Sequence, residues 1–138
     1  MGKWRRIKSI EESRAYFSRD IYAMEVTGIE IDRVREGYSK VSLKLDRRHE
    51  NAGKNVMGGV YYTMADFAFG VAANFEREPT VTFDSQITFL TPAVGDTLYA
   101  EAIEIRNGQH SCCYEVTVTD NLGTRCALAI MNGFKLDG

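Results

Sequence analysis

The feature that most constrains the fold is residues 58–76, GGVYYTMADFAFGVAANFE, which are apolar on nearly every side of the helix that their spacing predicts. One face has apolar residues three and four positions apart and is expected to pack on a sheet: Val60, Met64, Ala68, Val71 and Phe75. A second face is also largely uncharged and places one carboxylate, Asp66, among Gly59, Tyr62, Thr63, Gly70 and Ala73. The first face is expected to be covered by a sheet, and the second to meet another surface and not bulk water. The rest of the chain should therefore supply a layer that wraps around it.

That layer reads as antiparallel strands. Residues 27–46 predict two strands joined at Glu36-Gly37, in which apolar side chains alternate with polar ones. Four later runs also have strand composition: VTFDSQITFL, DTLYAEAIEIR, HSCCYEVTVTD and TRCALAIMNGFKL. Hairpins favour antiparallel pairing, so the predicted fold class is α+β, with one antiparallel sheet wrapped around one long central helix.

Local signals support this organisation. Asn107-Gly108 predicts a two-residue hairpin turn, and DNLG at residues 120–123 predicts another. Residues 9–20 predict a short helix with Ser9 as its N-cap. The apolar stripe of that helix is expected to be Ile10, Tyr16, Phe17 and Ile21.

Composition limits the class of protein. With 138 residues, 44% hydrophobic and 26% charged, the chain is expected to form a single domain over residues 1–138. A net charge of -2 gives no reason to expect nucleic acid as a partner. No apolar run reaches the roughly 20 residues of a membrane span, and the N-terminus lacks the apolar segment of a signal peptide. Three cysteines without metal-ligand spacing complete the expectation of a cytoplasmic protein.

Asp66 is the first candidate functional residue. A carboxylate on a face that meets another surface is costly unless it is paired or does chemistry. The plain alternative is an aspartate hydrogen-bonded to a neighbouring hydroxyl or backbone amide. Position and surroundings leave these two interpretations equally open.

A longer motif surrounds this aspartate. HENAGKNVMGGVYYTMADFAFGVAAN resembles the signature of hotdog-fold acyl thioesterases of the phenylacetate-degradation type, which runs roughly as N-x-x-G, a short spacer, H-G-G, then L-A-D and a small-residue helix. The matching positions are Asn51, Gly53, Gly58, Gly59, Ala65 and Asp66. The likeness continues through DSQITFLTPAVGDTLYAEA and VTDNLGTRCALAIMNGF and covers about residues 27 to 135.

The resemblance implies a hotdog fold and hydrolysis of an acyl-CoA or acyl-carrier-protein thioester. It makes Asp66 the general base for water or the nucleophile that forms a mixed anhydride. It gives the backbone N–H of Gly58 the oxyanion role, where a glycine that only permits a tight turn is the alternative. Asn51 would orient the water or the carboxylate, or only form an Asx-turn. Thr82 matches a position where some relatives carry a hydroxyl near the acidic residue, although strand preference explains a threonine equally well.

One position departs from the family pattern. Met57 stands where the family usually has histidine, and methionine cannot donate a hydrogen bond. This departure keeps a non-catalytic acyl-CoA binding protein as the alternative function. A hotdog-fold dehydratase is disfavoured because Asp66 has no histidine partner in its helix. His49 and His110 are expected in a loop and after a hairpin, and two isolated histidines argue against a metal site. No cofactor is expected beyond coenzyme A as part of the substrate.

Helix geometry predicts a dimer. Gly58 and Asp66 are eight residues apart, or about 12 Å along a helix axis. One carbonyl group must lie about 3 Å from both the oxyanion donor and the attacking group, which a single helix does not allow. The two residues can serve one reaction if they come from different subunits of a two-fold dimer. The resemblance agrees, since related thioesterases are dimers of hotdogs and often tetramers.

Overall fold

The structure, a computed structural model, describes residues 5–136. Two helices carry the labels α1 (Ile10–Phe17) and α2 (Gly58–Ala73). A π-helical turn (Tyr22–Thr27) follows α1, and a 3₁₀ turn (Arg47–His49) precedes α2. The strands are β1 (Glu30–Arg35), β2 (Tyr38–Lys44), β3 (Thr80–Phe89), β4 (Thr97–Asn107), β5 (Ser111–Asp120) and β6 (Arg125–Lys135).

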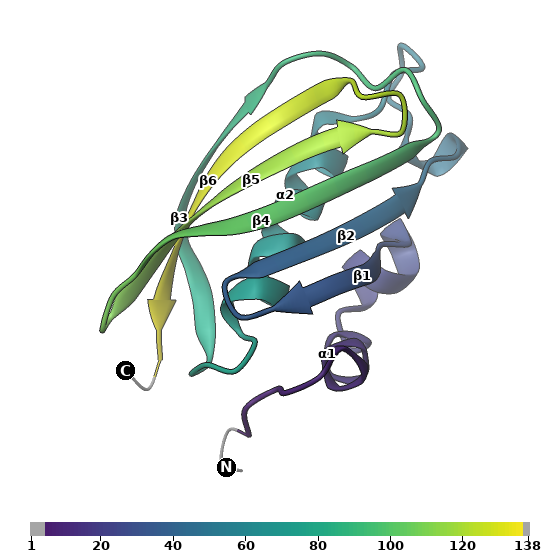
Figure 1. The fold of residues 1–138 in the computed structure, drawn as a ribbon. Helices are drawn as coiled ribbons and strands as arrows, with labels where there is room; N and C mark the ends of the chain where they lie inside the picture. The colour runs from purple at the N-terminus through teal and green to yellow at the C-terminus, as the bar shows by residue number, and fades with distance from the viewer. Residues whose placement is uncertain (1–4, 137–138) are drawn as a thin grey trace.

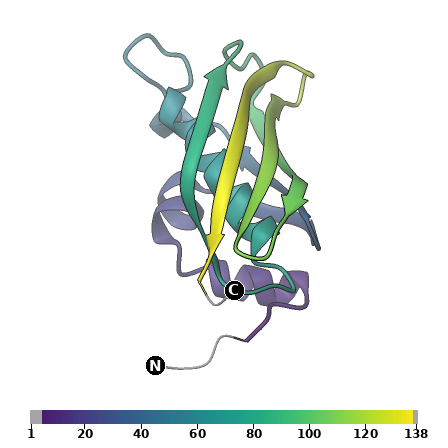
Figure 2. The same ribbon diagram turned by 90° about the vertical axis from the view of Figure 1, so that its left-hand side faces the viewer.

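The six strands form one sheet in the order β1-β2-β4-β5-β6-β3, and every neighbouring pair is antiparallel. The sheet curves around α2, which runs along its concave side (Figure 1). Figure 2 shows the same strands crossing in front of α2, with the N-terminal segment near its lower end. The predicted α+β arrangement is therefore confirmed. β1 and β3 are the edge strands of this sheet.

The core lies between α2 and the sheet. Met64, Ala68 and Val71 from the predicted sheet-facing side of the helix are completely buried. They belong to one apolar cluster with strand residues of equal burial, such as Val41 and Val116. Each large apolar side chain buried in this way contributes about 1.5–3 kcal/mol to stability. This apolar contact holds the helix, and with it Asp66, in a fixed position.

The second face of α2 is covered within the same chain at its C-terminal end. The helical spacing places Ala73 beside Asp66 on this face, and Ala73 is only 2% exposed and belongs to the core, in agreement with a face that meets another surface. There the following residue, Asn74, bonds both the N–H and the C=O of Thr80 as the chain enters β3. This face of the helix is therefore closed in its last turn and open further toward its N-terminus.

The N-terminal helix is shorter than predicted. Ser9 caps it, as expected, because its Oγ accepts from the N–H of Glu12 at 3.1 Å. The helix ends at Phe17, however, and the chain continues into the π-helical turn. Of the expected apolar stripe, Phe17 is buried, whereas Tyr16 and Ile21 are 38% and 53% exposed. The predicted stripe is therefore wrong at these two residues.

Side chains from the loop before α2 hold the π-helical turn in place. Arg48 donates to the carbonyl oxygen of Val26 at 3.0 Å. The N–H of Asp46 donates to Nδ1 of His49, so Nε2 carries the proton and donates to the carbonyl of Thr27 at 2.8 Å. His49 is buried and has a structural role here, in agreement with its expected place as a loop residue.

The two hairpin predictions have different outcomes in detail. Asn107 is the last residue of β4 and not part of the turn, whose tip is Gln109 and His110. The N–H of Gly108 closes that turn by donating to the carbonyl of Ser111 at 2.8 Å. The DNLG turn lies where predicted, with Gly123 in the left-handed region at φ 86°. No helix within residues 5–136 has the length and apolar character needed to cross a membrane.

Candidate active site

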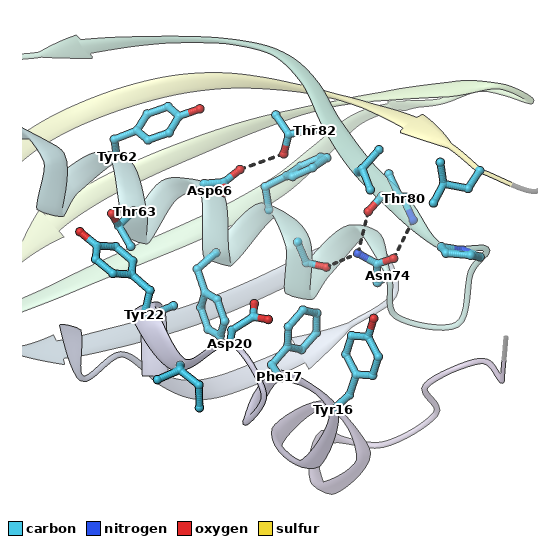
Figure 3. A pocket seen from close by; sticks show the side chains of 18 residues that line it. Tyr16, Phe17, Asp20, Tyr22, Tyr62, Thr63, Asp66, Asn74, Thr80 and Thr82 are labelled. Carbon is cyan, nitrogen blue, oxygen red and sulfur yellow. Dashed lines mark hydrogen bonds between the residues drawn. The ribbon is translucent and has the colours of Figure 1, made fainter. Parts of the chain in front are cut away.

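Asp66 lies in the middle of α2 and lines a cavity of about 780 Å³. One wall of the cavity comes from α2, a second from the start of β3, and a third from the N-terminal segment around the π-helical turn. The Thr82 hydroxyl on β3 donates to Oδ1 of Asp66 at 2.8 Å (Figure 3). The hydrogen bond to a neighbouring hydroxyl, one of the two interpretations that the sequence left open, is therefore present. The same carboxylate lines an open cavity, and its catalytic role stays a prediction.

A shift in strand register brings Thr82 and its neighbours to the helix. Successive residues of a strand normally point to opposite faces, so Thr80, Thr82 and Asp84 would share one face of β3. The β3–β6 register shifts between Thr82 and Asp84, and the next residue to bond α2 is Ser85. Its hydroxyl lies 2.7 Å from that of Tyr62 on α2. Such a register shift is typical of a β-bulge, which changes the direction in which the following side chains point. Here it allows residues of β3 before and after the shift to form hydrogen bonds with side chains of α2.

A second carboxylate, Asp20, shares this cavity with Asp66. Asp20 follows α1 and points toward the cavity from the N-terminal segment (Figure 3). Partial burial, and then the negative charge of Asp66, raise the pKa of Asp20 above its ordinary value. Sequence reasoning missed this residue, because its only local signal is a place at the end of a predicted helix.

Asn51 and Gly58 meet in a different, smaller cavity of about 330 Å³. Oδ1 of Asn51 accepts from the N–H groups of Gly53 and Asn55, at 2.9 and 3.1 Å. The Asx-turn, which the sequence left as the alternative role of Asn51, is therefore present. It also fixes the amide orientation, since two backbone donors require the oxygen, and leaves Nδ2 without a hydrogen bond to the described residues.

Gly58 is the first residue of α2, so its N–H has no partner within the helix and points outward from the helix start. A Cβ at this position would lie 3.3 Å from Cζ of Phe89. The missing side chain at Gly58 therefore lets the start of α2 lie close to Phe89 of β3 at the wall of this cavity. Met57 precedes it with 54% exposure, so its side chain takes no part in the core.

The loop after β3 closes the small cavity and is held by buried groups. Tyr61 accepts from the N–H of Ala93 at 2.9 Å. Oδ2 of Asp120 accepts from the N–H groups of Val94 and Gly95, at 2.8 and 2.9 Å. Burial opposes ionisation of Asp120, but these backbone donors outweigh it and hold the pKa of Asp120 well below its usual range. The carboxylate thus anchors the loop in its charged form.

The structure brings the four predicted site residues together as two pairs. Asp66 and Thr82 line the large cavity, Asn51 and Gly58 line the small one, and none of the described residues lines both. Within residues 5–136, no group of three or more His, Cys, Asp or Glu side chains is arranged to hold a metal ion. His110 lies at the exposed tip of its hairpin.

Comparison with known proteins gives the family. The family model described as the thioesterase superfamily matches residues 53–127, which include Gly58, Asp66 and Thr82. The chain belongs to the thioesterase superfamily. It is 28% identical over 132 residues to the acyl-coenzyme A thioesterase PaaI of Escherichia coli, covering 95% of this chain and 94% of that protein. It is 29% identical over 121 residues to a putative esterase of Archaeoglobus fulgidus, covering 87% and 79%.

Solved structures agree with this family. The PaaI protein of Escherichia coli superposes with a TM-score of 0.81 at 24% identity, over 94% of this chain and 98% of that chain. A hypothetical thioesterase from Streptococcus pneumoniae, solved with coenzyme A, has a TM-score of 0.81 at 26% identity, over 88% and 95%. The expectations of a hotdog fold and of a thioesterase of the PaaI type are confirmed.

Proposed function

We propose that this protein hydrolyses acyl-CoA thioesters, with Asp66 as the catalytic carboxylate. The observation that carries the proposal is the Asp66 side chain itself, fixed by one bond from Thr82 at 2.8 Å beside an open cavity. Since the hydroxyl occupies Oδ1, Oδ2 remains available to a water molecule or to the substrate carbonyl. Relatives that include an acyl-coenzyme A thioesterase, and a similar structure solved with coenzyme A, support this substrate class.

Two routes use this carboxylate. As general base, Asp66 takes a proton from water while the oxygen bonds to the carbonyl carbon; the tetrahedral oxyanion then collapses, and the C–S bond breaks to release the CoA thiolate. As nucleophile, Asp66 bonds to the same carbon and displaces the thiolate, and water then cleaves the mixed anhydride. In both routes, negative charge develops on the thioester oxygen and needs hydrogen-bond donors.

Gly58 and Asn51 supply such donors in the small cavity. The helix start presents the free N–H of Gly58 and the positive end of the helix dipole. The Nδ2 group of Asn51 adds a side-chain donor on the same cavity. Their cavity is separate from that of Asp66, so one chain alone does not assemble the whole site.

A two-fold dimer would join the two halves, and the surface of β3 supports this arrangement. β3 is an edge strand, whose free backbone groups are available for pairing. Along it Val81, Phe83 and Phe89 are 46%, 62% and 55% exposed. The strand also links the two cavities, since Val81 lines the large one and Phe89 the small one. We therefore include a homodimer with shared sites in the proposal, with pairing into a tetramer as a further step.

A second candidate function is acyl-CoA binding without turnover. The observation that favours it is Met57, whose exposed side chain brings no donor to the position where the family motif has histidine. Hydrolysis stays the leading proposal because the Asp66–Thr82 pair and the Asn51 amide remain in place.

We place the protein in the cytoplasm, since its three cysteines are free thiols, as a reducing compartment favours.

A hydrolysis assay on a panel of acyl-CoAs tests the proposal. The panel varies chain length and alkyl against aryl groups, and includes one acyl-carrier-protein thioester, with free thiol release as the readout. Turnover on at least one CoA thioester, lost in Asp66→Asn, is expected. Tight binding of the panel without thiol release would favour the binding protein instead.

A further inference from the structure

The described residues that line the cavity beside Asp66 bring two negative charges and no positive one. Among the described residues that line it, Asp20 and Asp66 are charged, and the others are neutral. Asp66 has Thr82 as its partner. The Asp20 carboxylate, in contrast, makes no hydrogen bond or ion pair with any of the described residues. Nothing in this part of the fold neutralises Asp20, so its charge acts on whatever enters the cavity.

We propose that Asp20 is a specificity-determining residue. It excludes acyl groups that end in a free carboxylate from this cavity and admits neutral acyl groups. The inference rests on the proposed function, because the acyl end of an acyl-CoA must be what enters. The nucleotide end of CoA carries phosphates, and a cavity without a cation does not suit them. The acyl end has no such charge unless the acyl group is itself a dicarboxylate.

The arrangement of the two carboxylates supports this role. Asp66 belongs to α2 and turns toward β3, whereas Asp20 points in from the segment after α1, on another wall (Figure 3). Burial, and then the charge of Asp66, raise the pKa of Asp20, so the two groups interact across the same space. A carboxylate at the end of the acyl group would bring a third negative charge into the cavity, and both Asp20 and Asp66 would repel it. Like charges about 7 Å apart, at an effective dielectric constant of about 20–40, weaken binding roughly 10- to 50-fold.

Asp20 is also unlike a residue kept for stability. Its side chain makes no bond to the described residues that an asparagine would lose. Its backbone has the structural role, since its N–H donates to the carbonyl of Phe17 at 2.9 Å and its carbonyl accepts from Met24 at 2.9 Å. Replacing the carboxylate should therefore leave the fold intact, with a melting temperature equal to or above that of the wild type.

Binding of two matched CoA thioethers tests the proposal without depending on turnover. S-hexyl-CoA and S-(5-carboxypentyl)-CoA have closely matched chains and differ by a terminal carboxylate, and calorimetry gives Kd for each. In the wild type, the carboxylate analogue should bind about tenfold or more weakly, and less so at high salt. Asp20→Asn should reduce the ratio of the two Kd values, carboxylate analogue to S-hexyl-CoA, by about tenfold. Asp20→Lys should reduce this ratio further or bring it below one.

Glu25→Gln is the matched control, because it removes the same charge from the same segment but Glu25 does not line the cavity. Its ratio of Kd values should equal that of the wild type. Equal binding of both thioethers by the wild type, no binding of either, or an unchanged ratio in both Asp20 variants would overturn the assignment. Discrimination without hydrolysis of any acyl-CoA in the panel would contradict only the proposed hydrolysis. Hydrolysis without discrimination would contradict only the role of Asp20.

Discussion

Asp66 and Thr82 form the contact on which the proposed chemistry depends. The bond of 2.8 Å joins two elements that the chain separates by sixteen positions, so it fixes where the carboxylate points. A base must be held in the right orientation to act, and a single bond leaves one carboxylate oxygen free to do so. The two residues should therefore differ in how much they affect turnover.

Asp66→Asn should reduce turnover by about 10² or more, because it keeps the shape of the side chain and removes the base. Thr82→Val should reduce it by about tenfold, as expected for losing one hydrogen bond to a charged group. Ser85→Ala is the control for Thr82, since it removes another hydroxyl that β3 presents to α2 but does not touch Asp66. Steady-state kinetics, with circular dichroism to check folding, makes the measurement. Near-normal turnover in Asp66→Asn would exclude its catalytic role.

Met57 allows a gain-of-function prediction at the same scale. Its side chain is exposed just before Gly58, so a polar ring in its place meets no buried neighbour there. If an imidazole at this position helps polarise the thioester, Met57→His should raise kcat/KM several-fold on a substrate that the wild type hydrolyses slowly. Met57→Gln controls for polarity alone. An unchanged or lower rate in a folded Met57→His protein would mean that the site works without this donor.

At the scale of elements, α2 is positioned by apolar packing on one side and by polar contacts to β3 on the other. The closest approach of α2 to a glycine of the sheet is at Gly133 of β6. A Cβ there would lie 2.6 Å from Cζ of Phe69 and 2.7 Å from Cγ2 of Thr80. Real side-chain atoms do not come so close, so glycine is required where helix and sheet meet.

Gly133→Ala should therefore destabilise the protein by about 1–3 kcal/mol, as overpacking of a core does. Thermal unfolding should show a melting temperature several degrees lower. Gly59→Ala is the matched control, because a Cβ at that position would have no atom within 4 Å and the helix gains a better helix former. If the two variants melted at the same temperature, the close approach at Gly133 would not limit packing.

Elements with a local pattern could be predicted from the sequence. The apolar stripe of α2, the alternation in the strands, the Ser9 cap and the Asp120 turn each depend on residues close together in the chain. The pairing of Asp66 with a strand hydroxyl followed from the family motif. In contrast, the π-helical turn depends on Arg48, more than twenty positions away, and its residues have no local signature.

The rest of the site depends on tertiary docking, which the sequence pattern does not contain. Asp20 reaches the cavity because the C-terminal end of α1 packs beside α2, where the rings of Phe17 and Phe67 lie edge to face with centroids 5.5 Å apart. The register shift after Thr82 likewise changes which β3 side chains face the helix, against the simple alternation that the sequence suggests. Ala73 on the second face is buried as expected, but the sequence pattern did not show that the same chain covers it there.

At the scale of the whole molecule, the division of the site into two cavities makes assembly part of the proposed mechanism. Each chain carries an acidic half, Asp66 with Thr82, and a donor half, Asn51 with Gly58. A two-fold axis that pairs β3 with its copy would produce two identical sites, each with one half from each subunit. Activity should then depend on subunit pairing and not only on the individual residues.

Mixing two inactive variants tests this dependence. Asp66→Asn removes the acidic half. Asn51→Asp removes the amide donor but keeps an oxygen for the N–H groups of Gly53 and Asn55, so the loop should stay folded. Heterodimers of the two would contain one doubly defective site and one intact site. After random subunit exchange, half of the dimers are heterodimers, so about a quarter of wild-type activity should return.

Mixing Asp66→Asn with Thr82→Val is the control, because both changes affect the acidic half and every site stays defective. Full activity in a proven monomer, or no recovery after exchange shown by mass spectrometry, would defeat the shared-site model.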